Sequence, residues 1–174
     1  MTIRFSVLMI SALTAAIALV PGVQAQGAAN EAAEAVARAY MGHYSAIDLE
    51  AMAALLAEDA EFTDPTAEDD EHGETGFVGT GRESLITLLT EFVETYHPIE
   101  FGFEWDEVFT SNSRVVFIGH VNALYPTETE GQNFRWRSQQ VTVITVRDGL
   151  VVRHQDFANY ASPDRSLVAA RTDN

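Results

Sequence analysis

The chain has 174 residues, a formal net charge of −16 at pH 7 and no cysteine, and all ten of its basic residues are arginine. The absence of lysine excludes Schiff-base catalysis, and the absence of cysteine excludes disulfides and thiolate metal sites. So acidic a protein repels nucleic acid and anionic lipid, and it disfavours an anionic substrate unless arginine is placed beside it. We therefore expect no nucleic-acid partner.

The first 25 residues have the pattern of a secretory signal peptide. Arg4 supplies a positive start, residues 5–20 are apolar, and a Pro-Gly pair ends the run. Small residues then lead to Ala25, which favours cleavage after this position. A membrane anchor is disfavoured because the apolar run is shorter than the ~20 residues that span a bilayer. We predict a signal peptide at residues 1–25 and one periplasmic or secreted domain at residues 26–174, with no membrane partner after cleavage.

The first half of this domain is predicted to be mainly helical. Hydrophobic residues at helical spacing predict one helix over residues 28–45 and another over residues 82–96. Asp48 is a candidate N-cap for a shorter helix between them. A short strand over residues 61–64, ended by a proline, and a polar loop over residues 66–81 complete this half.

The second half alternates between apolar and polar residues, which is typical of strands. Strands are predicted around residues 99–105, 114–124, 134–146 and 150–160, with a tight hairpin turn at Arg147-Asp148-Gly149. The tail from Ser162 is weakly patterned. Helices followed by an antiparallel meander indicate an α+β fold. We expect helices packed in the concave face of a strongly curved, mainly antiparallel sheet, forming a cone-shaped α+β barrel whose open mouth is the default binding site.

Polar side chains interrupt apolar rows on three predicted strands. Buried polar groups need hydrogen-bonding partners or a ligand, so these rows are candidates for a pocket wall. A core role, in which a hydrogen-bonded pair such as His154 and Asp156 only satisfies itself, is the alternative. The expected ligand-binding residues are His120, Asn122, Trp136, Gln140 and Thr142, and they converge with the candidate catalytic residues Tyr40, Asp64, His154 and Asp156.

Two segments resemble the nuclear-transport-factor-2-like superfamily, which includes ketosteroid isomerases and SnoaL-like proteins. The segment from Ala39 to Pro65, which ends in Asp-Ala-Glu-Phe-Thr-Asp-Pro, is similar to the opening of a ketosteroid isomerase. The segment 146–157, with the sequence VRDGLVVRHQDF, is similar to the last hairpin of SnoaL-like proteins and limonene-epoxide-hydrolase-like enzymes. The resemblance implies that Asp64 aligns with the carboxylate base of the isomerases and Tyr40 with their oxyanion-holding tyrosine.

The sequence departs from both groups of enzymes. Where the isomerases use a protonated aspartate as a second oxyanion donor, this chain has Thr142, or Gln140 if the hairpin gap is placed differently. The epoxide hydrolases combine an Arg-Asp pair with an aspartate of the last strand. Asp156 matches the latter, but His120 and Asn122 stand where the pair is expected.

Several functions remain open at this stage. The first is a cofactor-free isomerase, cyclase, dehydratase or hydrolase acting on a small, mostly apolar molecule. Its base would be Asp64 or the pair His154 and Asp156, with Tyr40 as hydrogen-bond donor. The second is a non-catalytic periplasmic binder of a small hydrophobic molecule, and the third is a dimerisation domain with a vestigial pocket. A homodimer is expected through the outer sheet face around Val141, and no metal site or cofactor is predicted.

Overall fold

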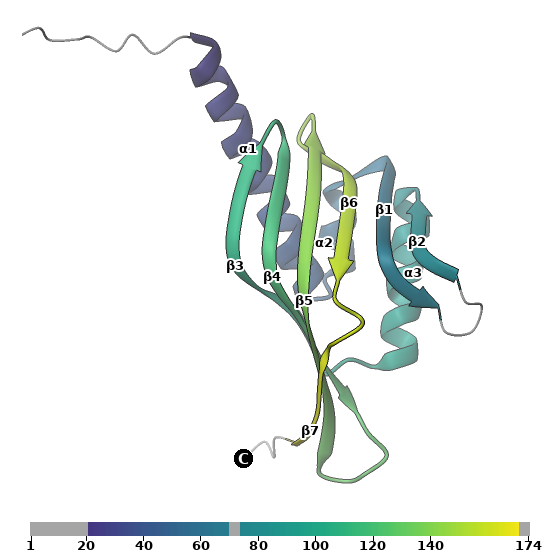
Figure 1. The fold of residues 1–174 in the computed structure, drawn as a ribbon. Coiled ribbons are helices and arrows are strands. Elements are labelled where there is room, and N and C mark those ends of the chain that lie inside the picture. Colours follow the sequence, from purple (N-terminus) through teal and green to yellow (C-terminus); the bar gives the residue numbers. More distant parts are fainter. Residues whose placement is uncertain (1–20, 70–73, 171–174) are drawn as a thin grey trace, which may run out of the picture.

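The computed structural model describes residues 21–69 and 74–170 and shows three helices and a curved sheet of seven strands (Figure 1). The first 20 residues of the predicted signal peptide lie outside the described residues, so export stays a prediction. Within the described part of the chain, no helix is long and apolar enough to cross a membrane. The elements in chain order are α1 (Pro21–Ser45), α2 (Leu49–Ala54), β1 (Leu56–Asp69), β2 (Glu74–Thr80), α3 (Arg82–Tyr96), β3 (Glu100–Ser111), β4 (Arg114–Pro126), β5 (Gln132–Arg147), β6 (Leu150–Ala158) and β7 (Asp164–Ala169).

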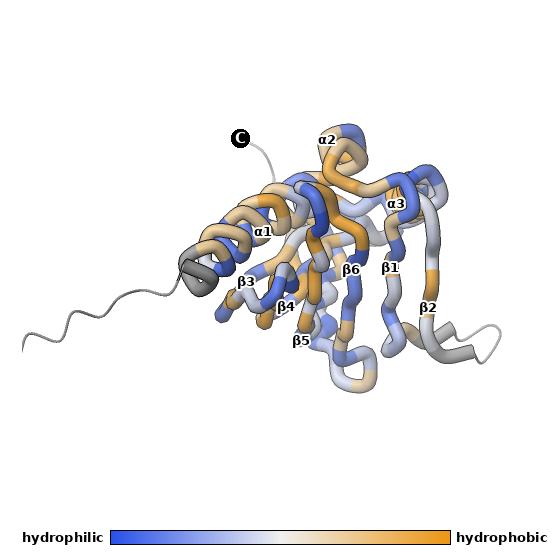
Figure 2. The backbone as a smooth tube through the Cα atoms, turned by 90° about the horizontal axis from the view of Figure 1, so that it is seen from above, coloured by the Kyte–Doolittle hydropathy of each residue, from blue (hydrophilic) through white to orange (hydrophobic). Residues whose placement is uncertain are grey.

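The strands follow the order β2-β1-β6-β5-β4-β3, and β7 pairs with the first half of β5. Neighbouring strands are antiparallel except β1 and β6, which are parallel. Seen from above, the helices lie on one side of the strands (Figure 2). The predicted α+β fold, with helices packed on a curved and mainly antiparallel sheet, is confirmed.

The core lies between the helices and the facing side of the sheet. Each helix contributes fully buried apolar side chains, and so do the strands at the centre of the sheet. Burial of a large apolar side chain contributes about 1.5–3 kcal/mol, so these contacts hold the helices in place. The largest apolar side chains that are fully buried are those of Tyr40, Met52, Leu56, Val115, Phe117, Ile144 and Val151.

Several local predictions agree with the structure. Asp48 caps α2 by accepting a hydrogen bond from the backbone N–H of Ala51 at 3.1 Å. The β5–β6 hairpin turns at Asp148 and Gly149, which have φ angles of 52° and 78°. Positive φ at both central residues is the requirement of a type I′ turn. Helix α3 has the predicted bounds.

Two strands were missed by sequence reasoning. The predicted polar loop 66–81 contains β2, and the weakly patterned tail contains β7. The first predicted strand is also longer, because β1 continues beyond Pro65. The pairing of β1 with β2 shifts between Asp64 and Glu68, and a proline is tolerated where the hydrogen-bond ladder is interrupted.

A glycine marks the bend in the β3–β4 ladder. The register of this pair shifts between Trp105 and Glu107, and Gly119 lies opposite Trp105. A Cβ atom at Gly119 would collide with the backbone carbonyl of Glu104, so only glycine permits this approach of the two strands. A bulge of this kind increases the local twist, which contributes to the curvature around the concave side.

Candidate functional site

A cavity of about 1320 Å³ lies between the concave face of the sheet and α3. Three polar residues of its inner wall, Asp64, Gln140 and Asp156, are buried. The lining residues Glu91, Thr95, His97 and Glu128, near α3 and the β4–β5 connection, are exposed. Within the part of the chain that the structure describes, no three side chains are grouped as a metal site would require. Nearly half of the lining residues are aromatic: Tyr44, Phe62, Phe77, Phe92, Tyr96, Phe101, Phe103, Tyr125, Phe134, Trp136 and Tyr160.

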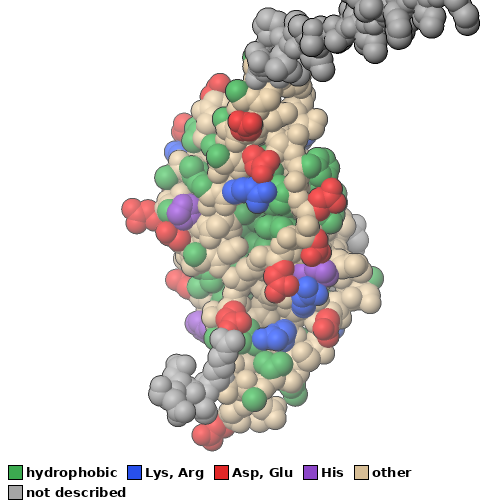
Figure 3. Space-filling view, turned by 90° about the vertical axis from the view of Figure 1, so that its left-hand side faces the viewer, with side chains coloured by type: hydrophobic (Ala, Val, Ile, Leu, Met, Phe, Trp, Pro, Cys, Tyr) green, Lys and Arg blue, Asp and Glu red, His purple; other side chains and the backbone are tan. Residues whose placement is uncertain are grey.

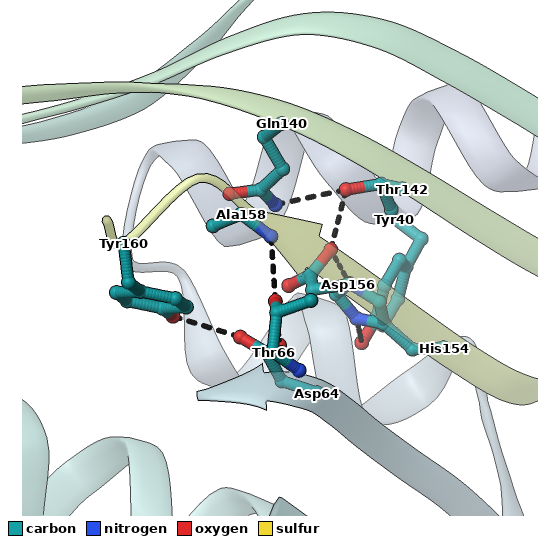
Figure 4. A network of polar contacts seen from close by, with 9 residues as sticks. All are labelled: Tyr40, Asp64, Thr66, Gln140, Thr142, His154, Asp156, Ala158 and Tyr160. Carbon is teal, nitrogen blue, oxygen red and sulfur yellow. Dashed lines mark hydrogen bonds and ion pairs between the residues drawn. The ribbon is translucent and has the colours of Figure 1, made fainter. Parts of the chain in front are cut away.

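Asp156 on β6 lies at the centre of a buried hydrogen-bond chain (Figure 4). Its Oδ1 accepts a hydrogen bond from the hydroxyl of Thr142 and lies 3.0 Å from Nε2 of His154. The other ring nitrogen of His154, Nδ1, lies 3.0 Å from the hydroxyl of Tyr40. Behind Thr142, Nε2 of Gln140 donates to the Thr142 hydroxyl at 2.9 Å. Residues from α1, β5 and β6 therefore converge on one carboxylate.

Donors and acceptors can be assigned consistently along this series of hydrogen bonds. Burial raises the pKa of Tyr40 well above its usual value, so its hydroxyl keeps its proton and donates to Nδ1 of His154. With Nδ1 as the acceptor, Nε2 of His154 carries a proton and donates it to Asp156, an assignment that follows from the network. Thr142 accepts from Gln140 and donates to the same carboxylate oxygen.

The second carboxylate oxygen of Asp156, Oδ2, takes no part in this series of hydrogen bonds. No described residue hydrogen-bonds Oδ2, although the residue is only 6% exposed and lines the cavity. In Figure 4 this oxygen points to the side on which Asp64 and Tyr160 lie. The arrangement is a carboxylate fixed through one oxygen and free to act through the other.

Asp64 on β1 lines the same cavity but is held differently. Its Oδ1 accepts hydrogen bonds from the backbone N–H of Thr66 at 2.9 Å, the hydroxyl of Thr66 at 2.6 Å and the backbone N–H of Ala67 at 3.1 Å. Its Oδ2 accepts one from the hydroxyl of Tyr160 at 2.7 Å. The Thr66 hydroxyl also accepts from the backbone N–H of Ala158 at 2.9 Å. Asp64 therefore fastens β1 to the end of β6, and both of its oxygens are engaged.

Tyr44 is a site residue that sequence reasoning did not select. It lies one helical turn after Tyr40 on α1, lines the cavity, and its hydroxyl has no hydrogen bond to any described residue. Burial, and next the negative charge of Asp156, raises the pKa of Tyr44 well above its usual value. The phenol is therefore protonated and available as a donor. The four-residue spacing from Tyr40 was the signal in the sequence.

The structure divides the predicted site residues into three groups. Asp64, Trp136, Gln140 and Asp156 line the cavity. The buried side chains of Tyr40, Thr142 and His154 stand behind Asp156 in the hydrogen-bond chain and do not line it. The expectation that His120 and Asn122 also face the ligand is wrong, because neither lines the cavity.

The error on β4 has a physical cause. The buried row of this strand is the apolar one, which includes Val115, Phe117 and Val121. His120 and Asn122 alternate with that row and face the other side of the sheet. Their neighbours there are charged residues of β3 rather than a ligand: His120 lies 3.7 Å from Asp106, and Asn122, next to Glu104, contributes to the lowered pKa of that carboxyl.

Solved structures with the same fold support this description. The chain has a TM-score of 0.60 and 19% identity to a candidate SnoaL-like polyketide cyclase from Shewanella denitrificans, covering 74% of this chain and 91% of that one. A candidate ketosteroid isomerase from Kribbella flavida gives a TM-score of 0.54 and 25% identity, with 76% and 82% covered. A phenazine biosynthesis-related protein from Pseudomonas aeruginosa gives 0.63 and 13%, with 79% and 86% covered.

The sequence itself also matches a known family. No curated protein is similar enough to match the chain. The sequence model described as a SnoaL-like domain matches residues 37–154, which is more than half of the chain and includes most of the cavity wall. The chain therefore belongs to the family of SnoaL-like domains.

Proposed function

We propose that this protein is a cofactor-free enzyme that moves a proton at the carbon next to a carbonyl group in a small, mostly apolar molecule, as an isomerase or cyclase does. The observation that carries the proposal is Asp156, with Oδ1 held by Thr142 and His154 and Oδ2 free at the wall of an aromatic cavity. A general base must be fixed within reach of the proton that it takes, and this geometry meets that condition.

In the proposed reaction, Oδ2 of Asp156 takes a proton from carbon, and the electron pair of that C–H bond moves to the carbonyl oxygen as an enolate. The free hydroxyl of Tyr44 donates a hydrogen bond to the new oxyanion. Returning the proton to another carbon completes an isomerisation. Attack of the enolate carbon on a second carbonyl of the same molecule forms an alkoxide, and transfer of the proton from Asp156 to this oxygen completes a cyclisation. Tyr40, which the resemblance assigns to the oxyanion, is occupied by His154 and acts as a positioning residue.

The test is a screen of small carbonyl compounds and epoxides for turnover, followed by a comparison of variants. We expect Asp156→Asn to lower kcat by about 10²–10⁴-fold, which is the usual contribution of a general base. The affinity for an uncharged carbonyl compound should change little, since a neutral amide still hydrogen-bonds. Asp106→Asn is the matched control, because it removes one carboxylate from an exposed site beside His120, outside the cavity.

The outcomes separate the candidate functions. Full activity of Asp156→Asn would remove the proposed base. Tight binding of a small hydrophobic molecule without turnover by the wild-type protein would make the chain a non-catalytic binder. Epoxide opening without activity on carbonyl compounds would indicate a hydrolase in place of an isomerase or cyclase.

We also propose that the exported protein starts at Gln26 and forms a homodimer through the outer sheet face. Ile118, Val141 and Phe157 lie directly opposite one another across β4, β5 and β6, and Ile118 and Phe157 are 36% and 38% exposed. A second copy would cover this apolar row. Intact-mass measurement of the exported protein tests the predicted N-terminus, and a mass that includes residues 1–25 would contradict it. Sedimentation tests the dimer, and a monomer at micromolar concentration would contradict it.

A further inference from the structure

The cavity carries negative charge that no basic side chain of its wall balances. Its lining includes the carboxylates of Asp64, Glu91, Glu128 and Asp156, whereas no arginine is among the lining residues described and the sequence has no lysine. His97, at the exposed end of α3, is the sole imidazole among these lining residues. Negative groups in a cleft with apolar walls focus their field into it and attract cations.

Several arginines are engaged with acidic partners elsewhere. Arg38 pairs with Glu34 at 2.8 Å, Arg137 with Glu104 at 3.0 Å and Arg153 with Glu61 at 3.1 Å. On the face of the molecule in Figure 3, the basic side chains lie beside acidic ones. These three arginines therefore neutralise surface carboxylates, and none of them lines the cavity.

The unbalanced negative charge matters most at the two buried carboxylates of the cavity wall. Asp64 and Asp156 are each 6% exposed, and neither accepts a hydrogen bond from a described arginine. Oδ2 of Asp156 faces the cavity without a described partner. A buried carboxylate is stabilised by an opposite charge, which an uncharged ligand does not supply and an anionic ligand makes worse.

The aromatic lining points to the same ligand class. Eleven aromatic rings line the wall, including Tyr44, Phe62 and Trp136 close to the polar residues. The faces of such rings carry partial negative charge and attract organic cations, most strongly when water is excluded. Aromatic rings also bind an apolar body by burial.

From these observations we propose that the cavity binds an apolar or aromatic molecule that carries a protonated amine or another organic cation. The proposal rests on the proposed function in that the same cavity takes the substrate, and it narrows the substrate class. Coulomb attraction acts over several ångströms, so the cation need not occupy the position at Oδ2 of Asp156 that a general base requires. An amine next to the reacting carbonyl would place its charge within reach of both Asp64 and Asp156.

The experiment measures binding rather than turnover. Naphthylmethylamine, naphthylmethanol and naphthoate share an aromatic body and differ in charge, and their dissociation constants are compared by calorimetry at neutral pH. We expect the amine to bind about tenfold more tightly than the alcohol, and the carboxylate to bind most weakly. Equal binding of amine and alcohol, preference for naphthoate, or no binding of any probe at millimolar concentration would overturn the proposal.

Substitution of single aspartates shows which carboxylates cause the preference for the amine. Asp156→Asn and Asp64→Asn should each reduce the preference for the amine over the alcohol while leaving the affinity for the alcohol nearly unchanged. Asp106→Asn changes the net charge by the same amount outside the cavity and should keep the full preference. Thermal unfolding of each variant confirms that it is folded. A preference lost equally in Asp106→Asn would assign it to the overall charge and overturn the proposal.

The binding comparison and the turnover test can succeed or fail separately. Preference for the amine without turnover of any carbonyl compound would support the ligand class and contradict the proposed enzyme. Turnover of neutral carbonyl compounds with no preference for a cation would do the reverse.

Discussion

The two walls of the cavity each present one aspartate, and the two aspartates are held in opposite ways. Asp64 on β1 and Asp156 on β6 have the same exposed fraction, 6%. The first accepts four hydrogen bonds spread over both oxygens, and the second accepts two on a single oxygen. Burial and residue type are therefore equal, and the distribution of donors is what separates a structural carboxylate from a reactive one.

The origin of the donors differs as well. Three of the four hydrogen bonds of Asp64 come from the next residues of the chain, Thr66 and Ala67, in the manner of an Asx turn. The two donors of Asp156 lie on strands, Thr142 on β5 and His154 on β6. His154 is in turn hydrogen-bonded to Tyr40 of α1. Asp64 closes a local turn, whereas Asp156 depends on the assembled fold. We expect mutations at the two walls to change different measurements.

The largest expected effect is on stability, at the β1 wall. Asp64→Ala leaves two backbone N–H groups and the hydroxyls of Thr66 and Tyr160 without their acceptor. We expect the free energy of unfolding to fall by about 2–4 kcal/mol, since each unsatisfied buried donor costs about 1–3 kcal/mol and part of the turn can rehydrate. Urea denaturation measures it.

The matched variant is Asp156→Asn, which keeps an acceptor for Thr142 and His154 and should lose less than half as much stability. Equal losses in the two variants would mean that the walls do not differ in the way described. A large loss of turnover in Asp64→Ala, with normal stability, would reverse the roles of the two aspartates.

The difference between the walls was only partly visible in the sequence. Strand alternation correctly put His154 and Asp156 on one buried face of β6, and Gln140 and Thr142 on one buried face of β5. The turn chemistry of Asp48, and the Asp-Gly hairpin between β5 and β6, are encoded within a few residues and were predicted. Local signals of this kind also supported the α+β fold.

What the sequence did not reveal depends on contacts between distant segments. His120 and Asn122 were placed on the wrong face because a polar residue in an apolar row has two explanations, a ligand or a partner on the next strand. Here the partners are Asp106 and Glu104 of β3. The donor set of Asp64 includes Tyr160, 96 residues away, and no pattern in a single sequence gives that pairing.

A smaller effect is expected from Tyr40→Phe, which disturbs the β6 wall from behind. Without the hydroxyl, Nδ1 of His154 loses its donor and the imidazole orients Asp156 less firmly. We expect kcat to fall about tenfold, as a misplaced catalytic group allows. Because Tyr40 does not line the cavity, the dissociation constant of a bound ligand should stay unchanged. A rise in that constant with unchanged kcat would place Tyr40 in ligand binding and not in positioning.

The smallest expected effect concerns the single bond that joins the β1 wall to Tyr160, and it depends on pH. Burial, and next the hydrogen bond to Asp64, raises the pKa of Tyr160 above the value of about 10 for an exposed tyrosine. A raised pKa in the folded state means that the folded protein holds this proton more tightly than the unfolded chain does. The resulting stability is complete below about pH 10 and is lost as the pH rises further, because the unfolded chain then releases the proton first.

Tyr160→Phe removes both the hydrogen bond and the titration, so its comparison with the wild type isolates this one contact. At neutral pH the wild type should be more stable by about 1 kcal/mol, the usual net contribution of a hydrogen bond. Above about pH 10 the advantage should shrink by at most about 1 kcal/mol per pH unit, a value reduced for the partial exposure of the phenol. Tyr40 and Tyr44, whose pKa values burial also raises, are present in both proteins and cancel from the difference. Urea denaturation between neutral and alkaline pH measures the gap, and a gap that stays constant over this range would show that the pKa of Tyr160 is not raised in the folded protein.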